Sequence, residues 1–145
     1  MGRGGFTKVV IVGLLALAGC AAPFTRAEKK PGSGVLYVYR PYKFVAGAFN
    51  FGASLTEVGT NRTLSTFRVR MDKYVAVDVP AGQHMLAIAG VDGKATVFPI
   101  SMSDGGEVAI RCEITGIGAH ATCTSPPLPA AFEEIKKTRH NVNGD

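Results

Sequence analysis

Apolar and polar residues alternate with a period of two through most of the chain, beginning at Val35. In Val35–Arg40 the odd-numbered residues point to one side and the even-numbered residues to the other. Such alternation is typical of a β-strand. Both faces of this strand are apolar or amphipathic, so we expect it to lie at the centre of a sheet. Pro41 ends the strand because proline has no N–H group to donate.

The same alternation returns at intervals of about ten residues. We expect further strands near residues 48–57, 63–70, 74–79, 84–91, 95–101, 107–115 and 120–125. Turn sequences separate several of them, notably Pro80-Ala81-Gly82 and Asp92-Gly93, of which the second is a strong hairpin signal. Short strands joined by such turns predict an all-β fold, an antiparallel β-sandwich of about seven or eight strands.

The C-terminal part of the chain has a different pattern. Pro129 suits the start of a helix, and we expect a helix over residues 130–139 with Glu133 and Glu134 early and basic residues late, as the helix dipole favours. One narrow apolar stripe runs along it. We expect this stripe to pack on the sandwich in preference to docking on a partner helix; it consists of Leu128, Phe132 and Ile135.

The N-terminal residues have the features of a secretory signal peptide. Arg3 and Lys8 precede an apolar run that ends at Cys20, and this run is too short to span a membrane. The sequence Leu17-Ala18-Gly19-Cys20 resembles the lipobox of bacterial lipoproteins. The resemblance implies that the signal peptide is removed before Cys20 and that the Cys20 sulfur receives a diacylglycerol. The alternative is an ordinary secretory signal with a coincidental cysteine.

This resemblance also implies a location. The residue after Cys20 is Ala21, not the aspartate that retains enteric lipoproteins in the inner membrane, so we expect an outer-membrane anchor with the protein facing the periplasm. The predicted organisation is a signal peptide over 1–19, a lipidated flexible tether over 20–33, and a β-sandwich domain over 34–145 with a C-terminal helix from about residue 130.

Composition narrows the classes of function. The chain has 145 residues, 46% hydrophobic and 19% charged, which fits one globular domain and excludes a disordered polyelectrolyte. Its net charge of +5 includes two residues of the signal peptide, and the remaining cations are scattered. We therefore expect no nucleic-acid partner.

Two cysteines remain once Cys20 is assigned to the lipid. Cys112 and Cys123 are equidistant from a point between Ile117 and Gly118, which lies within the expected turn Gly116-Ile117-Gly118. In a hairpin centred there they lie directly opposite each other, close enough for a disulfide. We expect that disulfide in an oxidising compartment. The alternatives are a zinc site, for which about four ligands are needed, and free or redox-active thiols.

The sequence offers little chemistry for catalysis. His84 is the obvious candidate base, with Asp78, Ser101 and Ser103 as candidate companions, but no nucleophile-elbow motif is present. A histidine beside a turn is more often structural. We expect no enzyme activity, no metal and no cofactor.

Aromatic residues gather in one part of the chain, at positions 37, 39, 42, 44, 49 and 51. Most are expected in the core or at its rim. Tyr42 and Phe44 follow Pro41 and fall in an expected loop, so together with Phe132 they are the candidate contact residues for a protein partner or a ligand.

Two segments support a family resemblance. Leu36–Pro41 reads LYVYRP, and Val79–His84 reads VPAGQH. In order and spacing they resemble a family of small uncharacterised bacterial envelope lipoproteins with a domain of unknown function. The resemblance implies an Ig-like or carboxypeptidase-regulatory-like sandwich, and no known reaction or ligand. We therefore expect a non-enzymatic interaction or scaffolding module that binds an envelope protein or polymer. The alternative is a module that binds a small ligand or a glycan such as peptidoglycan.

Overall fold

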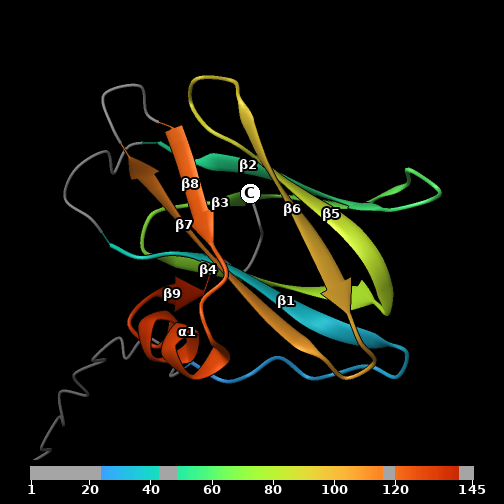
Figure 1. The fold of residues 1–145 in the computed structure, drawn as a ribbon. Coiled ribbons are helices and arrows are strands. Elements are labelled where there is room, and N and C mark those ends of the chain that lie inside the picture. The colour runs from blue at the N-terminus through green and yellow to red at the C-terminus, as the bar shows by residue number, and fades with distance from the viewer. Residues whose placement is uncertain (1–23, 43–48, 116–119, 141–145) are drawn as a thin grey trace, which may run out of the picture.

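The computed structural model describes residues 24–42, 49–115 and 120–140, which form two β-sheets packed face to face (Figure 1). The strands of sheet A are, in spatial order, β8 (His120–Thr124), β7 (Glu107–Thr115), β1 (Ser33–Arg40), β4 (Lys73–Pro80) and β9 (Arg139–His140). Those of sheet B are β3 (Thr63–Val69), β2 (Phe51–Glu57), β5 (Gly82–Ala89) and β6 (Ala95–Met102). The predicted all-β sandwich is confirmed.

The strands agree with the predicted ranges to within three residues at each end, apart from the unpredicted β9. β1 is central in sheet A, as expected, and every one of its residues is buried. Its pairing with β7 is parallel, as is that of β4 with β9, whereas we expected antiparallel pairing throughout. The whole of sheet B separates β1 from β7 in the sequence, so no tight turn forces those two strands to run in opposite directions.

The main hydrophobic core lies between the sheets. Alternate residues of each strand point into it, because successive side chains of a strand face opposite sides of the sheet. The inner face of sheet A contributes even-numbered positions of β1 and β7, and sheet B contributes odd-numbered positions of β2. Its large fully buried members include Leu36, Phe51, Leu55, Leu86, Ile88 and Ile110.

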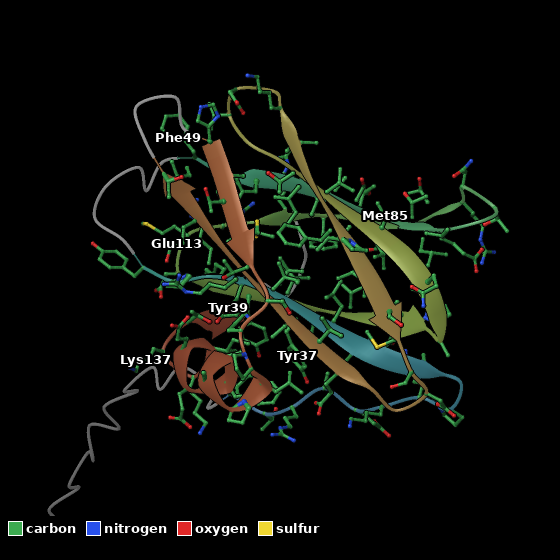
Figure 2. The ribbon with its side chains drawn as sticks, in the orientation of Figure 1. Tyr37, Tyr39, Phe49, Met85, Glu113 and Lys137 are labelled. Atoms are coloured by element: carbon green, nitrogen blue, oxygen red, sulfur yellow. A yellow bond between two sulfur atoms is a disulfide. The ribbon has the colours of Figure 1, made fainter. Side chains whose placement is uncertain are left out.

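A second core covers the outer face of sheet A. The helix α1 (Leu128–Ile135) lies on this face, and it buries Ala131, Phe132 and Ile135 against β1 residues that include Tyr37 and Tyr39 (Figures 1 and 2). The expected packing of the apolar stripe is therefore what the structure has. Among the described residues, no helix has both the length and the apolar character needed to cross a membrane.

The helix ends earlier than predicted. It stops at Ile135, and turn hydrogen bonds then lead the chain into β9. Glu133 and Glu134 consequently occupy the last turn instead of the first, and Lys136 follows the end of the helix. The prediction that charges in this helix complement its dipole is wrong, because tertiary contacts of Glu134 and a local ion pair of Lys136 determine where these side chains lie.

The segment 24–30 differs from the predicted tether. It runs along the outer face of sheet A beside α1 (Figure 1). The Phe24 ring lies among the rings of Tyr37, Tyr74 and Phe132, at centroid distances of 6.1, 5.4 and 5.6 Å. The Ala27 N–H donates a hydrogen bond of 3.0 Å to the Tyr37 hydroxyl. The folded domain therefore includes Phe24, because an aromatic side chain in this segment gains more from burial than from solvation.

The two turns that composition marked have different roles. Asp92-Gly93 lies in the loop between β5 and β6, with Gly93 at a positive φ of 74°, so the predicted hairpin is confirmed. Pro80-Ala81-Gly82 joins β4 of sheet A to β5 of sheet B, and the chain changes sheet there. Gly82 has a φ of 137°, a conformation that side chains disfavour.

Candidate functional site

Cys112 and Cys123 form the predicted disulfide. They are directly paired across β7 and β8, with a Cα–Cα distance of 4.1 Å. Both sulfurs belong to the core between the sheets, where Cys112 is fully buried. The bond fastens the edge strand β8 to sheet A, so its role is structural.

Two predicted site residues, Cys20 and Phe44, lie outside the described residues. Tyr42 is described, and its side chain is 62% exposed, as expected of a contact residue. Phe132 is different. It is only 4% exposed, and the Arg26 guanidinium covers its ring at 4.3 Å from the centroid. As a partner-contact residue Phe132 was a wrong choice, because α1 directs this ring towards the sheet.

The other aromatic residues of the group divide between core and rim. Tyr37, Tyr39 and Phe51 are fully buried, whereas Phe49 is 40% exposed (Figure 2). The guanidinium of Arg40 lies 4.8 Å from the centroid of the Phe51 ring and donates to the Phe49 carbonyl. The described part of this group therefore offers two exposed rings, those of Tyr42 and Phe49, at the ends of β1 and β2.

His84 does not form a catalytic group with its sequence companions. Its ring is 1% exposed and its Nε2 lies 2.7 Å from the Pro80 carbonyl oxygen. Asp78 is exposed on the outer face of sheet A, in an ion pair with Lys30. Ser101 is exposed and accepts a hydrogen bond of 2.9 Å from Gln83. These side chains point away from one another, so His84 serves to hold the crossover between the sheets.

A polar cluster fixes α1 to sheet A. Glu134 accepts hydrogen bonds from the Tyr39 hydroxyl at 2.9 Å and from Arg111 Nε at 2.8 Å, and Arg111 also pairs with Glu113. Burial, followed by the adjacent Glu134 carboxylate, raises the pKa of Tyr39. The hydroxyl is therefore kept protonated, as a donor to Glu134 requires. Figure 2 shows Tyr39 next to α1 and Glu113 further along β7.

A second polar cluster fixes the segment 24–30. The side chain of Glu107 is 7% exposed and faces two cations, Arg26 at 3.6 Å and Lys29 at 3.3 Å. Burial is the largest effect on the Tyr37 hydroxyl beside it, and the pKa of Tyr37 is raised. The largely buried Glu107 carboxylate is thus paired with two cations, and these ion pairs hold the segment 24–30 against sheet A.

A smaller hollow borders the second cluster; it is lined by Thr25, Arg26, Ala27, Glu28, Lys30, Tyr74, Ala76 and Asp78. The outer face of sheet B has the larger one. An open groove crosses its strands; it is lined by Gly52, Ala53, Ser54, Thr66, Phe67, Arg68, Arg70, Ala87, Ala89 and Ala95. Glycine, alanine and serine keep its floor low. Apolar side chains continue the same face, with Met85 37% exposed (Figure 2). Val97, which pairs with the lining residue Ala87, is 49% exposed.

The charge of this groove is one-sided. Arg68 and Arg70 belong to its lining, and no acidic residue does. It also lacks an exposed aromatic ring, because Phe67 is 6% exposed. Such a surface can accept the main chain of a partner and pair with its carboxylates. Within the described ranges no group of three or more His, Cys, Asp or Glu residues is placed to hold a metal ion.

Sequence reasoning missed this groove. A signal was present, since small residues recur at alternate positions in two strands, Gly52 and Ser54 in β2 and Ala87 and Ala89 in β5. Only the pairing of β2 with β5 brings these positions to one face, and the sequence does not give that pairing.

No protein-family model matches this chain, and no curated protein is significantly similar to it.

Proposed function

We propose that this protein is a non-enzymatic lipoprotein of the bacterial envelope, anchored by a lipid on Cys20, that presents the outer face of sheet B to a periplasmic protein. The observation that supports this most is the difference between the two outer faces. Sheet A is covered by α1 and by residues 24–30. In the described part of the chain nothing covers the outer face of sheet B, which carries exposed apolar side chains.

The groove favours one kind of partner. Arg70 is exposed in the lining and supplies positive charge, and the lining contains no acid, so the complementary surface is an acidic segment of a protein. The low floor formed by Gly52 and Ala87 admits a chain in close approach to the sheet. We therefore propose an acidic, extended protein segment as the occupant of this groove.

We propose no enzyme activity because the side chains considered as candidates for catalysis make structural contacts instead. His84 is buried against Pro80, Asp78 is paired with Lys30, and Ser101 belongs to a surface contact with Gln83. Each of these side chains has a structural contact, and the three lie apart from one another. General acid–base catalysis instead requires groups that lie within hydrogen-bond reach of one substrate atom.

Photo-crosslinking in cells tests the proposal. A photoreactive phenylalanine analogue replaces Ala95, which is exposed and lines the groove, or Glu133, which is exposed on α1 and serves as the matched control. We expect a specific adduct from position 95 and none from 133. We also expect the Arg70→Glu variant to remove it, because it reverses the charge that the partner meets.

The chemistry of the adduct decides the outcome. Mass spectrometry of the crosslinked peptide should identify an acidic segment, and a synthetic copy of that segment should bind the protein more weakly as salt is raised. An adduct that survives Arg70→Glu, or that forms equally from position 133, would refute the groove. Co-sedimentation with purified peptidoglycan, without any protein adduct, would favour the glycan alternative.

A further inference from the structure

The fold places the first described residue, Phe24, against α1. Its ring contacts three other rings of the outer face of sheet A, including Tyr74 at 5.4 Å and Phe132 at 5.6 Å. Beyond it, the Ala27 N–H donates to Tyr37, and Arg26 and Lys29 pair with Glu107. Phe24 is thus held at the α1 side of the domain by several independent contacts.

Cys20 lies only four residues before Phe24. Four consecutive Cα–Cα steps span at most about 15 Å, whatever the conformation of the residues between them. The domain is thicker than this: its two sheets are about 10 Å apart, and a helix layer adds about 10 Å more. A lipid on Cys20 therefore reaches the α1 side of the domain and not the outer face of sheet B.

The exposed side chains of this side suit a phospholipid surface. Long cations project from it, with Arg26 61%, Lys30 69% and Lys136 54% exposed, and Lys137 is exposed beside them. The carboxylate of Glu107, which faces Arg26, is only 7% exposed. Carboxylates beside two of the other cations are themselves exposed, with Asp78 37% exposed beside Lys30 and Glu133 69% exposed beside Lys136. Arg26 and Lys137 are therefore the cations best placed to meet lipid phosphates.

We infer that α1 and residues 24–30 form the membrane-facing side of the anchored protein, in contact with phosphate headgroups, and that sheet B faces away from the bilayer. This inference rests on the proposed lipid anchor at Cys20. It explains why the domain has one covered and one uncovered sheet face: the short spacer directs the uncovered face towards the periplasm.

Tryptophan fluorescence tests this orientation directly, because the chain contains no Trp and a single introduced Trp is the only indole signal. Two variants of the mature lipidated protein are compared. Lys137→Trp places the reporter beside α1, and Met85→Trp places it on sheet B, at the other side of the molecule (Figure 2). The proteins are reconstituted in vesicles of phosphatidylethanolamine and phosphatidylglycerol that contain a headgroup-spin-labelled phospholipid.

We expect the spin label to quench the indole of the Lys137→Trp variant several-fold more than that of the Met85→Trp variant, because nitroxide quenching acts only at short range. A matched pair of variants carries a Gly/Ser linker of about 15 residues, spanning about 20 Å on average, between Pro23 and Phe24. Both linker variants should still float with the vesicles. The difference in quenching between their two indoles should be much smaller. Circular dichroism confirms that each variant is folded.

The outcomes separate the inference from the anchor on which it rests. Flotation with equal quenching of the two reporters, or stronger quenching of the reporter on sheet B, overturns the orientation and leaves the anchor intact. Protein that does not float with the vesicles refutes the anchor and the orientation together. Flotation with selective quenching of the reporter beside α1, which the linker abolishes, supports both.

Discussion

Three of the four tyrosines are buried on the outer face of sheet A, and their hydroxyls are held in the neutral form. Burial is the main effect that raises the pKa of Tyr37, Tyr39 and Tyr74 above the usual value of 10.0. When folding raises the pKa of a group, the protonated group stabilises the folded protein. This stabilisation is fully present at a pH below the pKa of the unfolded chain, and it is lost as the pH rises through the pKa of the folded protein.

Alkaline titration should therefore unfold this protein, because the buried tyrosines ionise more easily in the unfolded chain. As pH increases above 10, we expect the phenolate absorbance of three of the four tyrosines to appear only together with the loss of the β-sheet signal in circular dichroism. Phenolate absorbance from all four while the sheet signal is unchanged would contradict the buried placement.

Two glycines in strands differ in the space that an added side chain would have. A Cβ on Gly34 would overlap the Met102 sulfur and lie 2.5 Å from the Gly106 carbonyl oxygen, whereas a Cβ on Gly52 meets nothing within 4 Å. We expect Gly34→Ala to lower the free energy of unfolding by about 1–3 kcal/mol, as overpacking does. Gly52→Ala is the control and should be neutral or slightly stabilising. Urea unfolding measures both, and equal effects would show that the close approach at Gly34 is not limiting.

At the scale of elements, the disulfide holds an edge strand. It closes a short loop, with a sequence separation of 11 between Cys112 and Cys123. In the chain-entropy model such a loop contributes about 2–3 kcal/mol, so we expect the double variant C112A/C123A to unfold at correspondingly lower urea concentration. Titration of the wild type with a thiol reagent under denaturing, non-reducing conditions should find neither cysteine free. Two reactive thiols would contradict the bond.

The segment 24–30 contributes to stability because it is part of the domain. Phe24 packs on three rings and is half-buried, so we expect Phe24→Ala to cost about 2 kcal/mol, less than a fully buried phenylalanine. Thr25→Ala, at an exposed position, is the matched control and should change the unfolding free energy little. If both substitutions are neutral, the segment is the flexible tether that composition suggested.

The alternation of apolar and polar residues predicted most of the strands. What it missed depends on contacts between segments that are far apart in the sequence. Alternation located β1 to β8, and the symmetry of Cys112 and Cys123 about a turn predicted their register. The composition of residues 20–33 favoured a tether, because one Phe among polar residues gives no periodic signal. What holds Phe24 is a cluster drawn from β1, β4 and α1, and no local window contains those residues.

The candidate surface shows the same limit on the scale of the whole molecule. Its lining residues come from four strands and their ends, and only the order of sheet B brings Gly52, Ala87 and Ala95 together. The exposed Tyr42 was predictable, since it follows a proline that ends a strand. Phe132 was not, because a single apolar stripe fits packing and docking equally well until its neighbour is known.

We propose that a lipid on Cys20 holds this sandwich at a membrane, and the mass of the mature protein decides whether it does. The protein is extracted from cell membranes with detergent, and its intact mass and N-terminal peptide are measured beside those of the Cys20→Ser variant. We expect a chain that begins at Cys20 and carries a diacylglyceryl group and an N-acyl group, with neither in the variant. A mature chain with an unmodified Cys20, or one that keeps residues 1–19, would contradict it.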